Sequence, residues 1–209
     1  MKTLGAITDP VGVAKPQTSA DRFFASLIRD ERDLPFIYLT LKISFTLIPL
    51  AILLFVPGIP GWLWWVAAIL YQYLNNVAFK GPYGLMMHCT SHRPWFRQEY
   101  GFLNYYLPWV IGPLFGQTPE TYYSHHVGMH HPENNMPDDE SSTMKFQRDS
   151  VKDFGIYVGT FLFMGIYHLC SYFVRKRRNR LLYRSVRGEL LFMAMCVGLC
   201  FVNWPATLV

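Results

Sequence analysis

The 209-residue chain is 51% hydrophobic and 17% aromatic, and only 16% of its residues are charged. Soluble domains carry about a quarter charged residues, so this composition argues against a soluble single domain and favours a membrane protein. The net charge of +5 is concentrated in one short segment, which makes nucleic-acid binding a poor interpretation.

The first 33 residues are polar, carry charges of both signs and precede the first apolar run. A cleavable signal peptide would contain such a run, so none is predicted. We expect residues 1–33 to form a polar N-terminal segment that stays in the cytoplasm.

Four apolar runs are each about as long as a membrane-spanning helix. A helix of about 20 residues spans roughly 30 Å of hydrocarbon, and four such helices are too much apolar surface for one small soluble domain to bury. The proline- and glycine-rich connection 57–61 predicts a tight turn, so the first two runs should form an antiparallel hairpin. We predict an all-α, multi-span membrane protein with about four transmembrane helices, at 34–56, 61–79, 154–174 and 189–209.

The apolar segment 102–116 is too short to span a bilayer and contains Pro108 and Pro113, so we predict a short interfacial or re-entrant helix. If it crossed, the two histidine clusters described below would lie on opposite faces of the membrane and could not share a metal. The acidic segment 132–153 predicts a solvated loop.

A basic segment separates the third and fourth apolar runs, where lipid headgroups are the natural partners. Three full crossings would place it outside the cell, against the tendency of short basic loops to stay in the cytoplasm. Two interpretations stay open: the third run does not fully cross, or the segment is an exception. Its basic residues are Arg175, Lys176, Arg177, Arg178, Arg180, Arg184 and Arg187.

Six of the seven histidines fall in two clusters, HCTSH and HHVGMHH. Within each cluster two histidines are four residues apart, which places both on one helical face, close enough to share a metal ion. Neutral imidazoles suit iron, zinc, copper or nickel, and six are more than one zinc ion needs. The candidate ligands are His88, His92, His126, His130 and His131, with His125 beside them.

Each cluster is framed by prolines and predicts a short histidine-bearing helix. For the second cluster Thr118 is a good N-cap, Pro119 suits the first helical position, and Pro132 disfavours helical geometry at His131. This helix should therefore fray at His131.

Two other kinds of metal site fit the sequence less well. A zinc protease needs a glutamate directly after the first histidine of its motif, and Cys89 stands there. A membrane haem protein places axial histidines singly within spans, where only His168 occurs. Two interpretations of His168 stay open. It either packs between helices, or it acts at the metal site as an extra ligand or a second-shell residue.

These residues resemble the pattern of the membrane fatty acid desaturases, H-x(3-4)-H, then H-x(2-3)-HH and later (H/Q)-x(2-3)-HH. His88 and His92 match the first box, and His126, His130 and His131 match the second. The stretch ENNMPDDESST also resembles the polar stretch after the second box. The resemblance covers most of the chain from the first apolar run, so residues 34–209 are interpreted as one desaturase-like membrane domain.

The resemblance implies an oxidoreductase with two iron ions held by the box histidines at the cytoplasmic face. Molecular oxygen would be the co-substrate, and two hydrogens would be removed from an unactivated acyl chain of a lipid, an acyl-CoA or an acyl carrier. His125 would be a ligand or a second-shell donor. Because the HPGG motif of a fused cytochrome domain does not occur, a separate electron donor is implied, either a ferredoxin or a cytochrome b5 type protein.

The third box has no match before Val209. Two boxes would leave two irons short of ligands, and lost ligands lower metal affinity steeply. We therefore expect either a C-terminally incomplete form, which would be inactive, or a site that a second copy completes.

Two alternatives to a desaturase stay open. The same oxidant would serve a hydroxylase or ketolase acting on a lipid or carotenoid, and a non-catalytic relative would keep the fold without holding iron. For a substrate channel Tyr105, Tyr106 and Trp109 are candidates, although aromatic residues are common at membrane interfaces without any such role.

Overall fold

The computed structural model describes residues 18–209, and the regular elements in this range are all helices. The predicted all-α class is therefore confirmed. The expected polar segment 1–33 is described only from residue 18, and its first 17 residues lie outside the described part. The N-terminal half comprises α1 (Ser19–Leu27), the 3-10 helix η1 (Glu31–Asp33), α2 (Leu34–Leu54), α3 (Gly61–Tyr73), the π-helix η2 (Leu74–Phe79) and α4 (Lys80–His92).

The C-terminal half begins with six short elements and ends with two long helices. These are the 3-10 helix η3 (Gln98–Tyr105), the π-helix η4 (Leu107–Ile111), α5 (Gly112–Leu114), α6 (Thr121–His125), the π-helix η5 (His126–His130), α7 (His131–Glu133), α8 (Val151–Arg175) and α9 (Asn179–Leu208).

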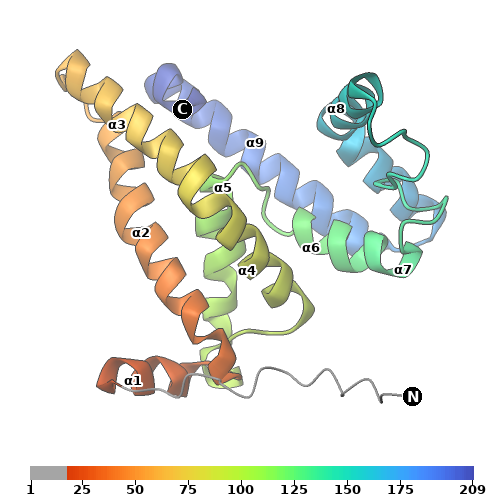
Figure 1. The fold of residues 1–209 in the computed structure, drawn as a ribbon, viewed down its shortest axis with the longest axis horizontal. Helices are drawn as coiled ribbons and strands as arrows, with labels where there is room; N and C mark the ends of the chain where they lie inside the picture. The colour runs from red at the N-terminus through yellow and green to blue at the C-terminus, as the bar shows by residue number, and fades with distance from the viewer. Residues whose placement is uncertain (1–17) are drawn as a thin grey trace, which may run out of the picture.

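The predicted hairpin is formed by α2 and α3. A proline in the first turn favours the start of α2, and the indole Nε1 of Trp64 donates to the Leu54 carbonyl at 3.0 Å across the turn. Ile43 and Leu47 on α2 are fully buried in the main core. From α3 the chain continues through η2 directly into α4, which ends at His92 (Figure 1).

The start of α2 lies beside the end of α4. Arg93, the residue after α4, pairs with Asp30 at 2.8 Å and with Asp33 at 2.9 Å. An isolated bridge joins Ile28 and Phe96. The histidine-bearing end of α4 is thereby fixed at the same end of the hairpin as the beginning of α2.

The segment predicted to be interfacial or re-entrant packs among the long helices. Tyr106 shares a 2.9 Å hydrogen bond with Ser44 of α2. The carbonyl of Leu114 accepts hydrogen bonds from Tyr71 at 3.0 Å and Asn75 at 2.6 Å. The segment is helical in three short pieces, and its relation to a bilayer remains a prediction.

The last helix, α9, runs from beside α6, next to the second histidine cluster, toward the end of the α2–α3 hairpin that holds its turn (Figure 1). Near its start Arg187 pairs with Glu120 at 2.5 Å. Near its other end Asn203 donates to the Leu54 carbonyl at 3.2 Å. The two ends of α9 therefore lie at opposite ends of the α2–α3 hairpin.

Within the described residues, three helical stretches are long and apolar enough to cross a membrane: Glu31–Leu54, Val151–Arg175 and Asn179–Leu208. They include three of the four predicted spans. The second apolar run forms α3 and η2 and continues into α4, so its crossing, and the number four, remain predictions.

Candidate metal centre

Four imidazoles from two helices meet in one place. His88 and His92 come from α4, and His126 and His131 come from the helix formed by α6, η5 and α7. The Nε2 atom of His126 lies 3.3 Å from that of His92 and 3.1 Å from that of His131. Ring nitrogens of His88, His92 and His126 all lie within 4.8 Å of one another, as the ligands of a shared metal ion would. The structure thus brings the two predicted histidine boxes together.

A π-helical turn decides which histidines of the second box face the first. In a regular helix His126 would pair with His130, four residues apart. Instead the wider turn η5 brings His126 beside His131, with ring centroids 4.5 Å apart, whereas those of His126 and His130 are 6.0 Å apart. Such π-turns often occur at functional sites, because the extra residue per turn redirects side chains. The predicted His88–His92 pair is present, with centroids 4.9 Å apart.

The predicted ends of the second histidine helix were wrong. Glu120, not Thr118, is the N-cap, and its backbone is left-handed with φ of 66°. The Thr118 hydroxyl instead donates to Glu189 at 2.7 Å. Pro132 does not end the helix at His131, because it occupies the first turn of α7, where a missing N–H is tolerated. The helix ends at Glu133, and Asn134 is its C-cap.

His130 is held by a buried carboxylate. Its Nδ1 lies 2.7 Å from Oδ2 of Asp139, whose side chain is fully buried. Asp139 also accepts bonds from Ser141 and from the Asn135 amide. Burial alone would raise the pKa of Asp139, but the bonds from Ser141, His130 and Asn135 outweigh it and hold the pKa below its usual value. An ionised Asp139 fixes the proton of His130 on Nδ1 and leaves Nε2 available to a metal.

Asp139 is a candidate functional residue that is not predicted from the sequence. The whole segment 132–153 was predicted to be a solvated loop, and most of its acids are at least partly exposed. Only Asp139 turns inward, because the turn from Asn135 to Ser141 wraps around its carboxylate. The available signal was its position in the polar stretch that follows the second box.

His125 and His168 do not join the four-imidazole group. The His125 ring is largely buried between His130 and Phe161, and its Nε2 has no hydrogen-bond partner among residues 18–209. His168 lies on α8, with its Nδ1 3.9 Å from Glu140. Their predicted roles as extra ligands or second-shell donors remain predictions.

The histidine cluster favours neutral imidazoles. Burial, followed by the neighbouring His131, His88, His92 and His130, lowers the pKa of His126 to about 4. Burial, His131 and His88 likewise lower the pKa of His92. Metals bind the neutral ring, so protons compete weakly at pH 7. A set of neutral nitrogen donors fits iron, and also zinc, copper or nickel.

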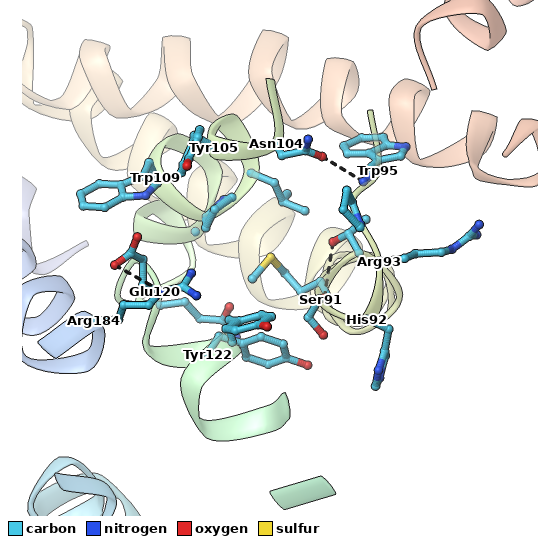
Figure 2. Close-up of a pocket in the computed structure, with 18 of the residues that line it drawn as sticks. Ser91, His92, Arg93, Trp95, Asn104, Tyr105, Trp109, Glu120, Tyr122 and Arg184 are labelled. Carbon is cyan, nitrogen blue, oxygen red and sulfur yellow. Dashed lines mark hydrogen bonds and ion pairs between the residues drawn. The ribbon is translucent and has the colours of Figure 1, made fainter. Parts of the chain in front are cut away.

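A cavity of about 400 Å³ lies next to His92. Figure 2 shows Tyr105 and Trp109 on one side, Tyr122 on another, and the Glu120–Arg184 pair at one end. The volume is within the range of small-molecule sites. Of the three aromatic residues proposed for a substrate channel, Tyr105 and Trp109 line this cavity, and Tyr106 does not.

A family model described as fatty acid desaturase matches residues 63–209. The matched range is well over half of the chain and includes both histidine clusters. Comparison with curated proteins and with solved structures gave no match.

Proposed function

The chain belongs to the fatty acid desaturase family, and we propose that it is an oxygen-dependent di-iron enzyme that introduces a double bond into an acyl chain once further ligands, from a third histidine box or a second copy, complete its metal site. The convergence of the two histidine boxes carries this proposal, because imidazoles 34 or more residues apart in sequence share one nitrogen-rich site. The family makes iron the metal that we assign to the site. The enzyme would be an oxidoreductase of lipid metabolism.

Each histidine has a distinct part in the proposed site. His88, His92, His126 and His131 would hold iron through the ring nitrogens that converge, and His130 would contribute the Nε2 that Asp139 leaves free. Bound iron would supply activation of molecular oxygen, with two hydrogens taken from the acyl chain. Two further electrons would come from a separate donor, a ferredoxin or a cytochrome b5 type protein, and two protons from the solvent, so that one oxygen molecule is reduced to two water molecules.

We assign the cavity beside His92 to the acyl chain. Its walls include Met87, Leu107 and Trp109, which offer apolar contacts to a hydrocarbon. Lipid, acyl-CoA or an acyl carrier would deliver the chain. We further propose an integral, multi-pass membrane protein with the histidine clusters on the cytoplasmic face, in keeping with the long apolar helices α2 and α9.

Replacing Trp109 by alanine is expected to shift the products toward longer acyl chains. The indole occupies one wall of the cavity, and each methylene gained or lost in an apolar pocket changes selectivity by about 1–3 kcal/mol. The measurement is the chain-length distribution of unsaturated products. Trp62→Ala is the control, since Trp62 is 70% exposed on α3, away from the cavity. An unchanged chain-length distribution in Trp109→Ala would show that the cavity does not hold the acyl chain.

Product analysis tests the proposed function. The protein is produced in cells that are fed a perdeuterated saturated fatty acid, and the recovered chains are analysed by mass spectrometry. We expect chains that have lost two deuterium atoms, in the presence of oxygen and not in the His92→Ala variant. A gained oxygen atom would indicate the hydroxylase or ketolase instead. Identical lipids with the wild-type protein and the variant would favour the non-catalytic relative.

A further inference from the structure

The position of α8 indicates on which side of the membrane the basic segment lies. The C-terminal end of α8 lies against the second histidine helix: the Tyr172 hydroxyl donates to Glu133 at 2.5 Å, and Lys176 lies 2.8 Å from Asp138. Glu133 ends the helix that carries His131. The basic residues after α8 are therefore at the histidine end of the molecule.

The middle of α8 lies beside the same helix and the same acidic segment. Phe161 makes an edge contact with the His125 ring at 6.0 Å, and Tyr157 contacts Phe146 at 5.6 Å. A small cavity separates Glu140, Ser141 and Lys145 from α8, between Tyr157 and His168. Segment 134–150 thus runs back along α8, from its C-terminal end toward its N-terminal end.

This arrangement is incompatible with a membrane crossing by α8. A 25-residue helix is about 37 Å long, so in a crossing helix its centre, Phe163, would lie near the bilayer midplane. Segment 140–146 would then lie deep in the hydrocarbon, although it is largely irregular and carries the exposed Lys145. Irregular backbone and exposed charge are not tolerated there without a protein or water shell.

The outer face of α8 suits a lipid surface. Ile156, Phe163, Tyr167 and Val174 fall on one line of the helix, and their side chains are all exposed. At the C-terminal end of α8 the opposite face packs on the protein through buried Tyr172 and Leu169, whereas nearer the N-terminus Phe154 and Leu162 are exposed on that side. A helix that lies in the plane of the membrane interface buries its apolar face in the acyl region.

The basic residues support the same placement. Some of these basic residues are paired within the protein: Arg175 pairs with Glu140 at 3.1 Å, and Arg187 pairs with Glu120 at 2.5 Å. Arg177 and Arg180 are exposed and have no acidic partner in the range 18–209. They remain available to anionic headgroups next to α8.

We propose that α8 lies along the bilayer surface at the histidine side, with its Ile156–Phe163–Tyr167–Val174 face bound to lipid, and does not cross. The crossings are then made by α2, by the continuous α3–η2–α4 helix and by α9. The basic segment returns to the histidine side, which removes its conflict with the tendency of basic loops to stay in the cytoplasm. This placement does not depend on the metal or on the reaction.

Cysteine labelling tests the placement. Single cysteines are introduced as Asp149→Cys before α8, Arg177→Cys after it, and Val56→Cys at the hairpin turn, in a variant whose four natural cysteines are serine. An impermeant maleimide is applied to right-side-out and inside-out vesicles. We expect positions 149 and 177 to be labelled from one side and position 56 from the other. Labelling of 149 and 177 from opposite sides would overturn the proposal.

A depth measurement provides an independent test. A nitroxide attached through Phe163→Cys is compared for its accessibility to oxygen, which concentrates in the hydrocarbon, and to a water-soluble nickel complex. We expect the nitroxide to lie about 5–10 Å below the headgroup boundary. A nitroxide at the bilayer midplane would show that α8 crosses.

Discussion

Replacing Gly188 by alanine is expected to lower the apparent melting temperature in detergent by roughly 6–12 °C. Gly188 is buried on α9, and a Cβ there would overlap the backbone carbonyl oxygen of Pro119 and crowd Thr121. Backbone cannot rotate away as a flexible side chain can, so the helices must separate. We expect a loss of about 3 kcal/mol, the upper part of the usual range for overpacking, which corresponds to this shift in a chain of this size.

Gly198→Ala is the matched control, because Gly198 lies on the same helix with nothing within 4 Å of the added methyl group. Alanine is the better helix former by about 1 kcal/mol, so this variant should melt at the same temperature or slightly higher. Equal melting temperatures for the two variants would contradict a close approach of α9 to Pro119. The contact matters for the site, because Pro119 and Glu120 immediately precede the second histidine helix.

Replacing Asp139 by asparagine is expected to weaken iron binding ten- to a hundredfold, the usual effect of losing the carboxylate that orients a metal-binding histidine. Asparagine preserves the size of the side chain but loses its charge, and its amide can donate to Nδ1 of His130. The ring proton would then move to Nε2, the nitrogen that a metal needs. Competition with a chelator measures the affinity, and thermal melting confirms that the variant is folded.

Asp138→Asn separates this effect from a general loss of negative charge. Asp138 is the adjacent residue, is 56% exposed and pairs with Lys176 at the surface. Exposed ion pairs contribute little, so iron affinity should change less than twofold. If both variants lost affinity equally, Asp139 would have no specific part in holding His130.

The long helices could be predicted from the sequence because their apolar runs are local signals. The run 34–56 became α2, and 154–174 became most of α8. The fourth run was placed at 189–209, but α9 begins ten residues earlier, at Asn179. Its first turns are basic, and they are helical because they pack on other elements, as the Arg187–Glu120 pair illustrates. Hydropathy alone does not carry that information.

The residue types of the candidate site could be predicted from the sequence, but the pairing of its histidines could not. The spacing of the histidines indicated a shared metal site, and the structure brings the two boxes together. The pairing of His126 with His131 depends on a π-helical turn, whereas the prediction assumed a regular helix. The burial of Asp139 and the left-handed cap at Glu120 arise from contacts between segments. The periodicity of the sequence does not predict such contacts.

The most direct test of this account is the iron content of the purified protein, measured by plasma mass spectrometry for the wild type and for His126→Ala. The Nε2 atom of His126 lies within 3.3 Å of those of both His92 and His131, so no other imidazole of the cluster is as central. The account predicts iron in the wild-type protein and at least a tenfold lower content in the variant, with its melting temperature retained. Equal iron content in the two proteins, or none in either, would contradict an iron site at the histidine cluster.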